Sequence, residues 1–284
     1  MYLFKSVHQL DQYLQHFRAS NARVGFIPTM GALHAGHLSL VEASNEQNEL
    51  TVCSIFVNPT QFNEGSDLEK YPRTPGLDLA LLAAANCDVV FMPQVDEVYP
   101  PGVELDSPTP PKALVQGMEG QFRPGHFEGV VQVVKRLLDL VQPSSLYMGQ
   151  KDYQQAAIIG WMIEYTKLAV ELVVCPIMRE ENGLAMSSRN VRLHPDIRPK
   201  AIVLYQTLLS VKEKLGTLSL PELQSWALEQ LSGPDFRPEY FDIVDGQSLQ
   251  PLDNVGENDF AVACTAVWAG EVRILDNMIL QKPE

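Results

Sequence analysis

A short apolar segment, a glycine-containing turn and a helical pattern follow one another near the start of this chain, and this order constrains its fold most. Val24–Ile27 is apolar throughout, Gly31 and Gly36 follow it, and apolar residues then recur at helical spacing over 38–43. The pattern predicts a buried strand, a tight turn and a helix that starts near His37. Because glycines let a ligand approach the main chain and helix starts attract phosphate, the turn is a candidate phosphate site.

Strand-like apolar segments alternate with helical patterns over the first 176 residues. Further strands are predicted at 51–57, 88–92, 146–148 and 170–175, and helices at 6–19, 77–85, 130–141 and 152–167. This alternation is typical of α/β proteins with a parallel sheet, which bind ligands at the carboxyl ends of the strands. We therefore expect a Rossmann-like parallel sheet flanked by helices in a domain over 1–176, with a long functional loop at 94–125.

The chain changes character after residue 176. Helical patterns over about 196–215 and 221–231 precede three segments that resemble strands, at 240–244, 260–268 and 271–275. Gly270 lies between the last two, where a hairpin-like turn is expected. We predict a smaller C-terminal α+β domain over 177–284.

Composition favours a globular protein of the cytoplasm. No apolar run is long enough to span a membrane, and no apolar signal segment follows a basic N-terminus. The four cysteines are far apart, which predicts buried thiols in a reducing compartment and neither a disulfide framework nor a zinc site; they are Cys53, Cys87, Cys175 and Cys264.

A net charge of −14 argues against extended binding to nucleic acid, which depends on many Lys and Arg contacts. Any phosphate site must therefore be locally positive against a negative background. The candidate cations are Lys151, Arg179 and Arg189, together with two histidines of the turn, His34 and His37.

The two histidines give the turn the sequence His34-Ala35-Gly36-His37. Imidazoles beside a phosphate can donate hydrogen bonds to it as charge develops. A His-x-x-His pair by itself also fits ordinary turn and helix residues, and neither a cysteine nor a third histidine lies nearby to complete a metal site. The whole string is similar to the HxGH signature of the nucleotidyltransferase superfamily, whose members bind ATP at this turn.

Six separated motifs extend this resemblance along the chain. They are Pro28–His37, Phe56–Phe62, Tyr71–Thr74, His126–Val130, Gly149–Gln155 and Met186–Asn190. Together they resemble the pantoate–β-alanine ligase family, from the first predicted strand to Asn277. The resemblance implies that ATP, with Mg²⁺, drives the joining of (R)-pantoate to β-alanine through a pantoyl-adenylate, giving pantothenate, AMP and pyrophosphate. It also implies a homodimer.

The resemblance assigns roles to individual residues. The ATP-binding residues are Met30, Gly31, Ala32, Leu33, His34, Ala35, Gly36, His37, Gly149, Gln150, Lys151, Asp152, Met178, Met186, Ser187, Ser188 and Arg189. The catalytic candidates are His37, His34 and Lys151. We expect His37 to donate one N–H to the phosphates as a neutral imidazole, because a helix start lowers the pKa of a histidine. Gln61 is assigned to pantoate and β-alanine, and Gln155 to pantoate.

Some of these residues have a second interpretation that the sequence leaves open. Asp152-x-x-Gln155 is also a capping-box pattern, in which Gln155 would serve the main chain. Asp88 is either a magnesium ligand or the residue that starts a strand. Asn182 replaces the aspartate usual in the family, which keeps the turn chemistry and removes a charge.

Three other classes compete with the ligase. A nucleotidyltransferase that moves AMP onto a phosphate would call for Arg or Lys where Gln61 and Gln155 stand. A class I aminoacyl-tRNA synthetase is disfavoured by the short chain and the negative charge. A nucleotide-binding protein without catalysis is disfavoured by His34, His37, Lys151 and Arg189.

Overall fold

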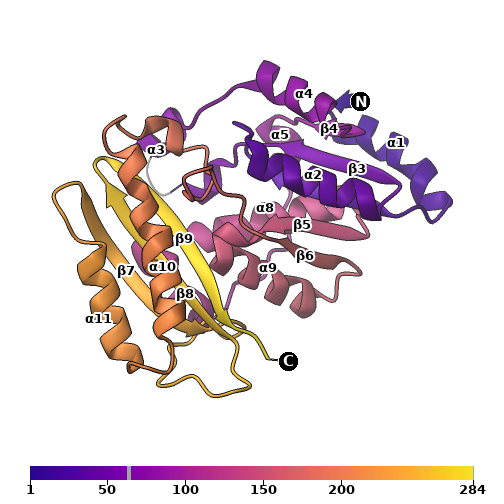
Figure 1. Cartoon of the computed structure of the whole chain (residues 1–284). Helices are drawn as coiled ribbons and strands as arrows, with labels where there is room; N and C mark the ends of the chain where they lie inside the picture. Colours follow the sequence, from indigo (N-terminus) through magenta and orange to yellow (C-terminus); the bar gives the residue numbers. More distant parts are fainter. Residues whose placement is uncertain (63–64, 284) are drawn as a thin grey trace. The chain divides into compact units, whose positions relative to one another are not determined.

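The computed structural model of this chain describes residues 1–62 and 65–283, which fall into two compact units (Figure 1). The first unit consists of Met1–Pro110, Arg123–Gly149 and Ile158–Pro176. The second contains the residues from Ile177 onward together with two earlier segments, Pro111–Phe122 and Gln150–Ala157.

Among the described residues, the first unit forms a six-stranded parallel sheet with the strand order β1-β4-β3-β2-β5-β6. The strands are β1 (Tyr2–Phe4), β2 (Val24–Thr29), β3 (Leu50–Ile55), β4 (Val89–Phe91), β5 (Ser145–Gly149) and β6 (Glu171–Cys175). The helices are α1 (Val7–Ala19), α2 (Ala35–Gln47), α3 (Gly65–Lys70), α4 (Pro75–Ala84), α5 (Val95–Val98), α8 (His126–Val141) and most of α9 (Tyr153–Thr166), and the 3₁₀ turn is η1 (Pro59–Gln61). The predicted α/β sheet is confirmed. Only the edge strand β1 was missed, because three residues carry no periodic pattern.

Alternate residues of the central strands build the core on the face of the sheet that α2 and α4 cover. Ile27, Cys53, Val90 and Tyr147 are buried there together with apolar residues of the two helices. Successive side chains of a strand point to opposite faces, so the residues that alternate with these, such as Phe26, point to the other face of the sheet. Helix α8 contacts β2 and α1. Its buried residues recur along the helix, as the apolar pattern over 130–141 predicts.

The second unit combines an antiparallel sheet with two longer helices and several short turns. The strands follow the order β7-β8-β9 and are β7 (Phe236–Asp245), β8 (Ala261–Ala269) and β9 (Val272–Gln281). The helices are α6 (Lys112–Val115), α7 (Glu119–Phe122), α10 (Val203–Lys214) and α11 (Leu220–Gln230), and the 3₁₀ turns are η2 (Gln150–Asp152), η3 (Asn190–Arg192) and η4 (Arg198–Ile202). Figure 1 shows α10 and α11 side by side along the sheet, and they contact β9 and β7 respectively. The smaller α+β architecture is confirmed.

Two local predictions were wrong, for reasons that the structure makes clear. The segment 94–125 is not one long loop but includes α5, α6 and α7, each of four residues and so too short to show a helical period. Strand β9 continues to Gln281, six residues beyond its predicted end at Leu275. The polar pair Asp276 and Asn277 interrupts the apolar pattern there, yet both side chains are buried in hydrogen bonds.

The four cysteines are buried free thiols, as predicted. Burial raises the pKa of the Cys53 thiol well above its usual range and raises that of Cys87 to about 12. Among the described residues, no helix is both long enough and apolar enough to cross a membrane.

Helix α8 lies so close to η1 that only glycine fits at one of its positions. A Cβ added to Gly129 would lie 2.5 Å from the carbonyl oxygen of Thr60 and 2.8 Å from the Cα of Gln61. We predict that Gly129→Ala lowers the free energy of unfolding by about 2 kcal/mol, because main chain has to shift. Gly160→Ala is the matched control: its Cβ would meet only Leu172 at 3.4 Å, so the variant should gain about 0.5–1 kcal/mol from helix propensity. Urea unfolding measures both, and equal effects would contradict the close approach.

Candidate active site

The strand order brings several predicted site residues of the first unit to one edge of its sheet. Strand β2 lies between β3 and β5, so the chain winds outward in opposite directions from the β2–β5 pair. Ligands of open α/β sheets bind at such a switch point, at the carboxyl ends of the strands. The turn 30–37 follows β2, Gln61 follows β3, and Gly149 ends β5. These three elements therefore define the candidate site in this unit.

A buried carboxylate holds the turn after β2. Gly31 and Ala32 both have positive φ, 81° and 51°, a conformation that is uncommon for alanine. Asp78, at the start of α4 and 1% exposed, accepts the N–H of Ala32 at 3.1 Å through Oδ2 and that of Leu33 at 2.8 Å through Oδ1. Its Oδ1 also accepts the Thr74 hydroxyl at 3.1 Å. The carboxylate thus stabilises a main-chain path that would otherwise be strained.

Sequence reasoning did not identify Asp78. The residue stands in the first turn of a helix, where aspartate is common for purely local reasons, and the amides it binds lie 45 and 46 residues earlier in the chain. Its nearness to the Tyr71–Thr74 motif was the only available signal. The contact also shows that the N–H groups of Ala32 and Leu33 already have protein acceptors.

The two histidines of the turn are joined through hydrogen bonds at the start of α2. His34 is the N-cap, and its main-chain carbonyl accepts the N–H of His37 at 2.8 Å, while its main-chain N–H donates to His37 Nδ1 at 3.3 Å. The two rings lie 4.0 Å apart between centroids. Because His37 Nδ1 accepts a hydrogen bond, the proton of a neutral ring is on Nε2. The neutral imidazole expected for His37 stays a prediction. The helix begins two residues earlier than predicted, at Ala35.

Gln61 is held with a defined orientation of its amide. The side chain is buried, with Oε1 accepting from Asn58 Nδ2 at 3.3 Å and Nε2 lying 2.9 Å from the sulfur of Met30. Asn58 is itself fixed, because its Oδ1 accepts the hydroxyl of Tyr99 at 2.9 Å and the hydroxyl of Thr60 at 3.1 Å. The structure therefore brings two predicted site residues together, Gln61 from the end of β3 and Met30 from the end of β2.

Asp88 lies at the opposite edge of this sheet. It precedes β4, and its Oδ2 accepts the main-chain N–H of Thr51 at 2.8 Å, at the amino-terminal ends of β3 and β4. Because the strands are parallel, this edge is the one remote from the turn 30–37. The structure therefore favours the strand-start role that the sequence left open, and Asp88 does not fit a magnesium ion at the candidate site.

In the second unit, Asn277 of β9 fastens the predicted turn at 150–152. Its Nδ2 donates to the carbonyl oxygens of Gln150 at 2.9 Å and Lys151 at 2.8 Å, and its Oδ1 accepts from the Gln150 side chain at 3.1 Å. Lys151 Nζ lies 3.1 Å from Asp152 Oδ1. Three residues assigned to ATP are thus carried on a turn whose main chain is tied to a buried asparagine.

The two neighbouring glutamines at the start of α9 have different environments. Gln154 is buried and structural: it donates to the carbonyl oxygens of Leu114 at 2.8 Å and Gly117 at 3.1 Å, and accepts the N–H of Glu119 at 3.0 Å. Gln155 lies in the first turn of α9, which begins at Tyr153. Its assignment to pantoate stays a prediction.

The segment from Met178 to Met186 folds back on itself. The Met186 N–H donates to the Met178 carbonyl at 2.9 Å, so two residues assigned to ATP are neighbours. Asn182 Oδ1 accepts the N–H of Leu184 at 3.1 Å, so it closes the turn as expected without the charge of an aspartate.

The loop that follows is closed by its own side chains. Ser187 Oγ accepts the N–H of Arg189 at 3.3 Å. Asn190, which is buried, donates to the carbonyl oxygen of Ala185 at 3.0 Å and to Glu180 at 2.9 Å. These contacts give the predicted phosphate-binding residues 186–189 a fixed path.

Arg179 has a structural role, contrary to its place among the candidate phosphate-binding cations. Its two terminal nitrogens bind the two oxygens of Asp276 at 2.6 and 2.9 Å, and one also donates to the Gly183 carbonyl at 3.1 Å. The guanidinium stacks 3.9 Å from the centroid of the Tyr205 ring. Burial raises the pKa of the Asp276 carboxyl, and the Arg179 charge opposes that rise.

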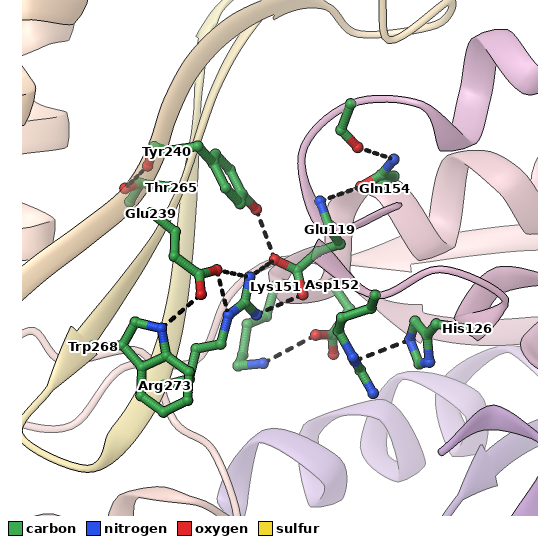
Figure 2. A network of polar contacts seen from close by, with 12 residues as sticks. Glu119, His126, Lys151, Asp152, Gln154, Glu239, Tyr240, Thr265, Trp268 and Arg273 are labelled. Atoms are coloured by element: carbon green, nitrogen blue, oxygen red, sulfur yellow. Dashed lines mark hydrogen bonds and ion pairs between the residues drawn. The ribbon is translucent and has the colours of Figure 1, made fainter. Parts of the chain in front are cut away.

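A second ionic network anchors α7 to the antiparallel sheet of the same unit (Figure 2). Arg273 binds both oxygens of Glu119 at 2.7 and 2.6 Å and donates through Nε to Glu239 at 2.7 Å. Tyr240 donates to Glu119 at 2.9 Å and Trp268 to Glu239 at 2.6 Å. Since the Glu119 N–H also bonds Gln154, the network reaches the segment that carries Gln155.

The first unit is a Rossmann-like α/β sheet with a glycine–histidine turn at its switch point, and the second is a small α+β unit. Together they place the protein in the class of α/β proteins with a Rossmann-like sheet. The family model described as pantoate-beta-alanine ligase matches residues 2–279. The pantothenate synthetase of Porphyromonas gingivalis is 47% identical over 281 residues, covering 98% of this chain and 99% of that protein. The one from Bacteroides fragilis is 45% identical over 280 residues and covers 98% of each.

Solved structures agree with these sequence relatives. A pantothenate synthetase from Thermus thermophilus superimposes with a TM-score of 0.91 at 42% identity over the whole of both chains. A pantoate-beta-alanine ligase from Francisella tularensis, complexed with beta-gamma ATP and beta-alanine, gives a TM-score of 0.80 at 32% identity, covering 99% of this chain and 98% of that one. The chain belongs to the pantoate–β-alanine ligase family, which confirms the resemblance found in the sequence, and it is a ligase.

We predict that Asp78→Asn lowers the free energy of unfolding by about 2 kcal/mol, because the amide NH₂ would face one of two main-chain N–H groups that now have an acceptor. Asp106→Asn, at an exposed position of the same unit, is the control and should change stability by less than about 0.5 kcal/mol. Urea unfolding of both variants checks this. Equal stabilities for the two variants would show that the carboxylate does not hold the turn.

We also predict that Arg273→Lys destabilises the protein by about 3 kcal/mol, since one ammonium cannot replace a fork that contacts the buried carboxylate of Glu119 and the half-buried carboxylate of Glu239. Arg198→Lys, in the more exposed pair with Glu180, should cost less than about 0.5 kcal/mol. Thermal and urea unfolding compare the two changes. If Arg273→Lys changes the free energy of unfolding as little as Arg198→Lys does, the network stabilises the protein no more than an exposed ion pair.

Proposed function

We propose that this ligase condenses (R)-pantoate with β-alanine, using ATP and releasing AMP and pyrophosphate, to give pantothenate. The match of the family model over residues 2–279, with the histidine turn at the switch point of the sheet, carries the proposal. The Francisella tularensis relative is described in complex with beta-gamma ATP and beta-alanine, which supports the same co-substrates here.

In the first step a carboxylate oxygen of pantoate attacks the α-phosphorus of ATP. A phosphorus–oxygen bond forms, the bond to the bridging oxygen of the leaving group breaks, and pyrophosphate departs, which leaves a pantoyl-adenylate. The reaction depends on placement and on neutralising charge, and it needs little acid or base chemistry. His37 suits this need as a neutral donor through Nε2, because its Nδ1 accepts the N–H of His34.

The remaining phosphate contacts are assigned to residues of both units. His34 and the helix start at Ala35 belong to the first unit, and Lys151, Ser187 and Arg189 to the second. Lys151 and Arg189 supply positive charge, and the hydroxyl and main-chain N–H groups supply directed donors. Arg179 is not among them, because it forms a two-bond ion pair with the buried carboxylate of Asp276, whereas Lys151 is paired with the exposed carboxylate of Asp152.

Gln61 and Gln155 are proposed to bind pantoate, and Gln61 also β-alanine. A neutral amide offers both donors and an acceptor. It therefore suits a hydroxy acid, because each hydroxyl of the acid both donates and accepts a hydrogen bond. The fixed amide of Gln61, between Asn58 and Met30, supports a role in orienting the substrate. In the second step the amine of β-alanine attacks the carbonyl carbon of the adenylate, the amide bond forms, the nitrogen loses a proton and AMP leaves.

Further parts of the proposal follow from the family resemblance. Mg²⁺ accompanies ATP; such an ion takes much of its coordination from phosphate oxygens and water, so it does not depend on Asp88. A homodimer is part of the proposal on the resemblance alone. A location in the cytoplasm is also proposed, and the buried free thiols support it. The predicted domain roles, nucleotide and pantoate binding for residues 1–176 and a lid over ATP for residues 177–284, are part of this proposal, although residues 111–122 and 150–157 belong to the second compact unit.

Exchange of labelled pyrophosphate into ATP tests the reaction directly. With magnesium, ATP and pantoate but no amine, we expect exchange that depends on pantoate, and β-alanine should then release AMP. If exchange does not depend on pantoate, or if ATP is consumed only with a phosphorylated acceptor, the result would contradict the ligase reaction and favour a nucleotidyltransferase. The absence of exchange and of product with all three substrates would overturn the proposal.

We predict that His37→Ala lowers kcat by roughly a hundredfold or more, as expected when a donor to the transition state is lost. His8→Ala, at an exposed position of α1, is the control and should leave kcat unchanged. Steady-state kinetics, with circular dichroism to confirm folding, measure the difference. Near-normal turnover of the folded His37 variant would contradict the role given to this residue.

A further inference from the structure

The motif that begins α8, His126–Val130, has no assigned role, although the structure places it against the main chain of Gln61. Gly129 allows this approach, because any side chain there would strike Thr60 and Gln61. The carbonyl oxygen of Gly129 accepts from Asn58 Nδ2 at 3.1 Å. Helix α8 and η1 are thus joined by main-chain contact and by the residue that also holds the Gln61 amide.

His126 makes the most directed of these contacts. Its ring is buried, 6% exposed, and Nδ1 lies 2.8 Å from the main-chain carbonyl oxygen of Gln61. On the other side of the ring, Nε2 lies 3.1 Å from a terminal nitrogen of Arg123. These two contacts therefore restrict which nitrogen of the buried ring can be protonated.

The partners select one form of the ring. A carbonyl oxygen can only accept, so Nδ1 must carry a proton and donate to Gln61. A guanidinium has donors and no acceptor, so Nε2 must accept and cannot carry a proton. His126 is therefore the neutral Nδ1–H tautomer, and an imidazolium would direct an N–H at the cationic Arg123.

We propose that His126 is a positioning residue for the organic acid: it fixes the main chain of Gln61, and through it the amide that orients pantoate. This inference rests on the proposed function of Gln61. The carbonyl of Gln61 is held from α8 by His126, and the side-chain amide is held by Asn58, so both ends of the residue are set before the substrate binds. Preorganisation of this kind lowers KM for the ligand that the residue contacts.

Two substitutions separate the two nitrogens of the ring. The Asn amide is attached to Cγ, as Nδ1 is, so His126→Asn keeps a donor where Gln61 needs one. The Gln amide is attached one bond further out, near the position of Nε2, so His126→Gln can still accept from Arg123 but loses the donor to Gln61. The pair thus removes one contact at a time from a buried site.

We expect His126→Asn to keep KM for pantoate within about threefold of the parent, and His126→Gln to raise it by about tenfold. KM for ATP should change by less than about twofold in both. If both variants raise the two KM values alike, or if the Gln variant binds pantoate as well as the Asn variant, His126 has only a structural role and the inference is overturned.

Gln61→Ala, measured in parallel, distinguishes this inference from the proposed function. If Gln61→Ala leaves KM for pantoate unchanged, the assignment of Gln61 fails and His126 has nothing to position. If Gln61→Ala raises it and His126→Gln does not, only the inference about His126 fails.

The tautomer of His126 provides a second test, which uses the parent protein and needs no substitution. In ¹⁵N-labelled full-length protein, long-range ¹H–¹⁵N correlation of the His126 ring should show one protonated nitrogen, Nδ1, at neutral pH. A proton on Nε2, or a doubly protonated ring, would contradict the hydrogen bond to Gln61 and overturn the proposal.

Discussion

The turn after β2 depends on one buried carboxylate. Gly31 and Ala32 adopt left-handed backbone angles, and Asp78 compensates by accepting the two N–H groups that this path leaves pointing in one direction. A carboxylate accepts such pairs more strongly than a neutral group, because the hydrogen bonds are assisted by charge. Once the turn is fixed, the start of α2 is fixed with it, and so is the reciprocal pair of His34 and His37.

The same device, a side chain that binds main-chain groups of a turn, recurs in the second unit. Asn277 ties two carbonyl oxygens of the turn at 150–152, and Gln154 ties three main-chain groups of the segment 114–119. Neutral amides serve here because each has donors and an acceptor in one plane. The turns that carry the assigned ATP residues are therefore held by buried polar contacts, which lose most if one partner is removed.

The parts of this molecule that repeat a pattern were predictable from its sequence, and the parts that depend on distant contacts were not. Alternating apolar strands and amphipathic helices identified the α/β sheet, and the turn with His34 and His37 stood out through its local motif. Asp78 and Asn277 could not be found in that way, since their partners lie 45 and 126 or more residues away. The four-residue helices of 95–122 and the end of β9 were missed because short or polar segments show no period.

The ionic contacts also narrow how a chain of net charge −14 can hold a triphosphate. Arg179 is neutralised by Asp276, and Arg273 by Glu119 and Glu239, so neither guanidinium brings net positive charge to a ligand. In the proposed function, the cations assigned to ATP are Lys151 and Arg189, whose two charges are fewer than those of a triphosphate. The same proposal therefore assigns the remaining stabilisation to neutral donors such as His37 and to Mg²⁺ bound with the nucleotide.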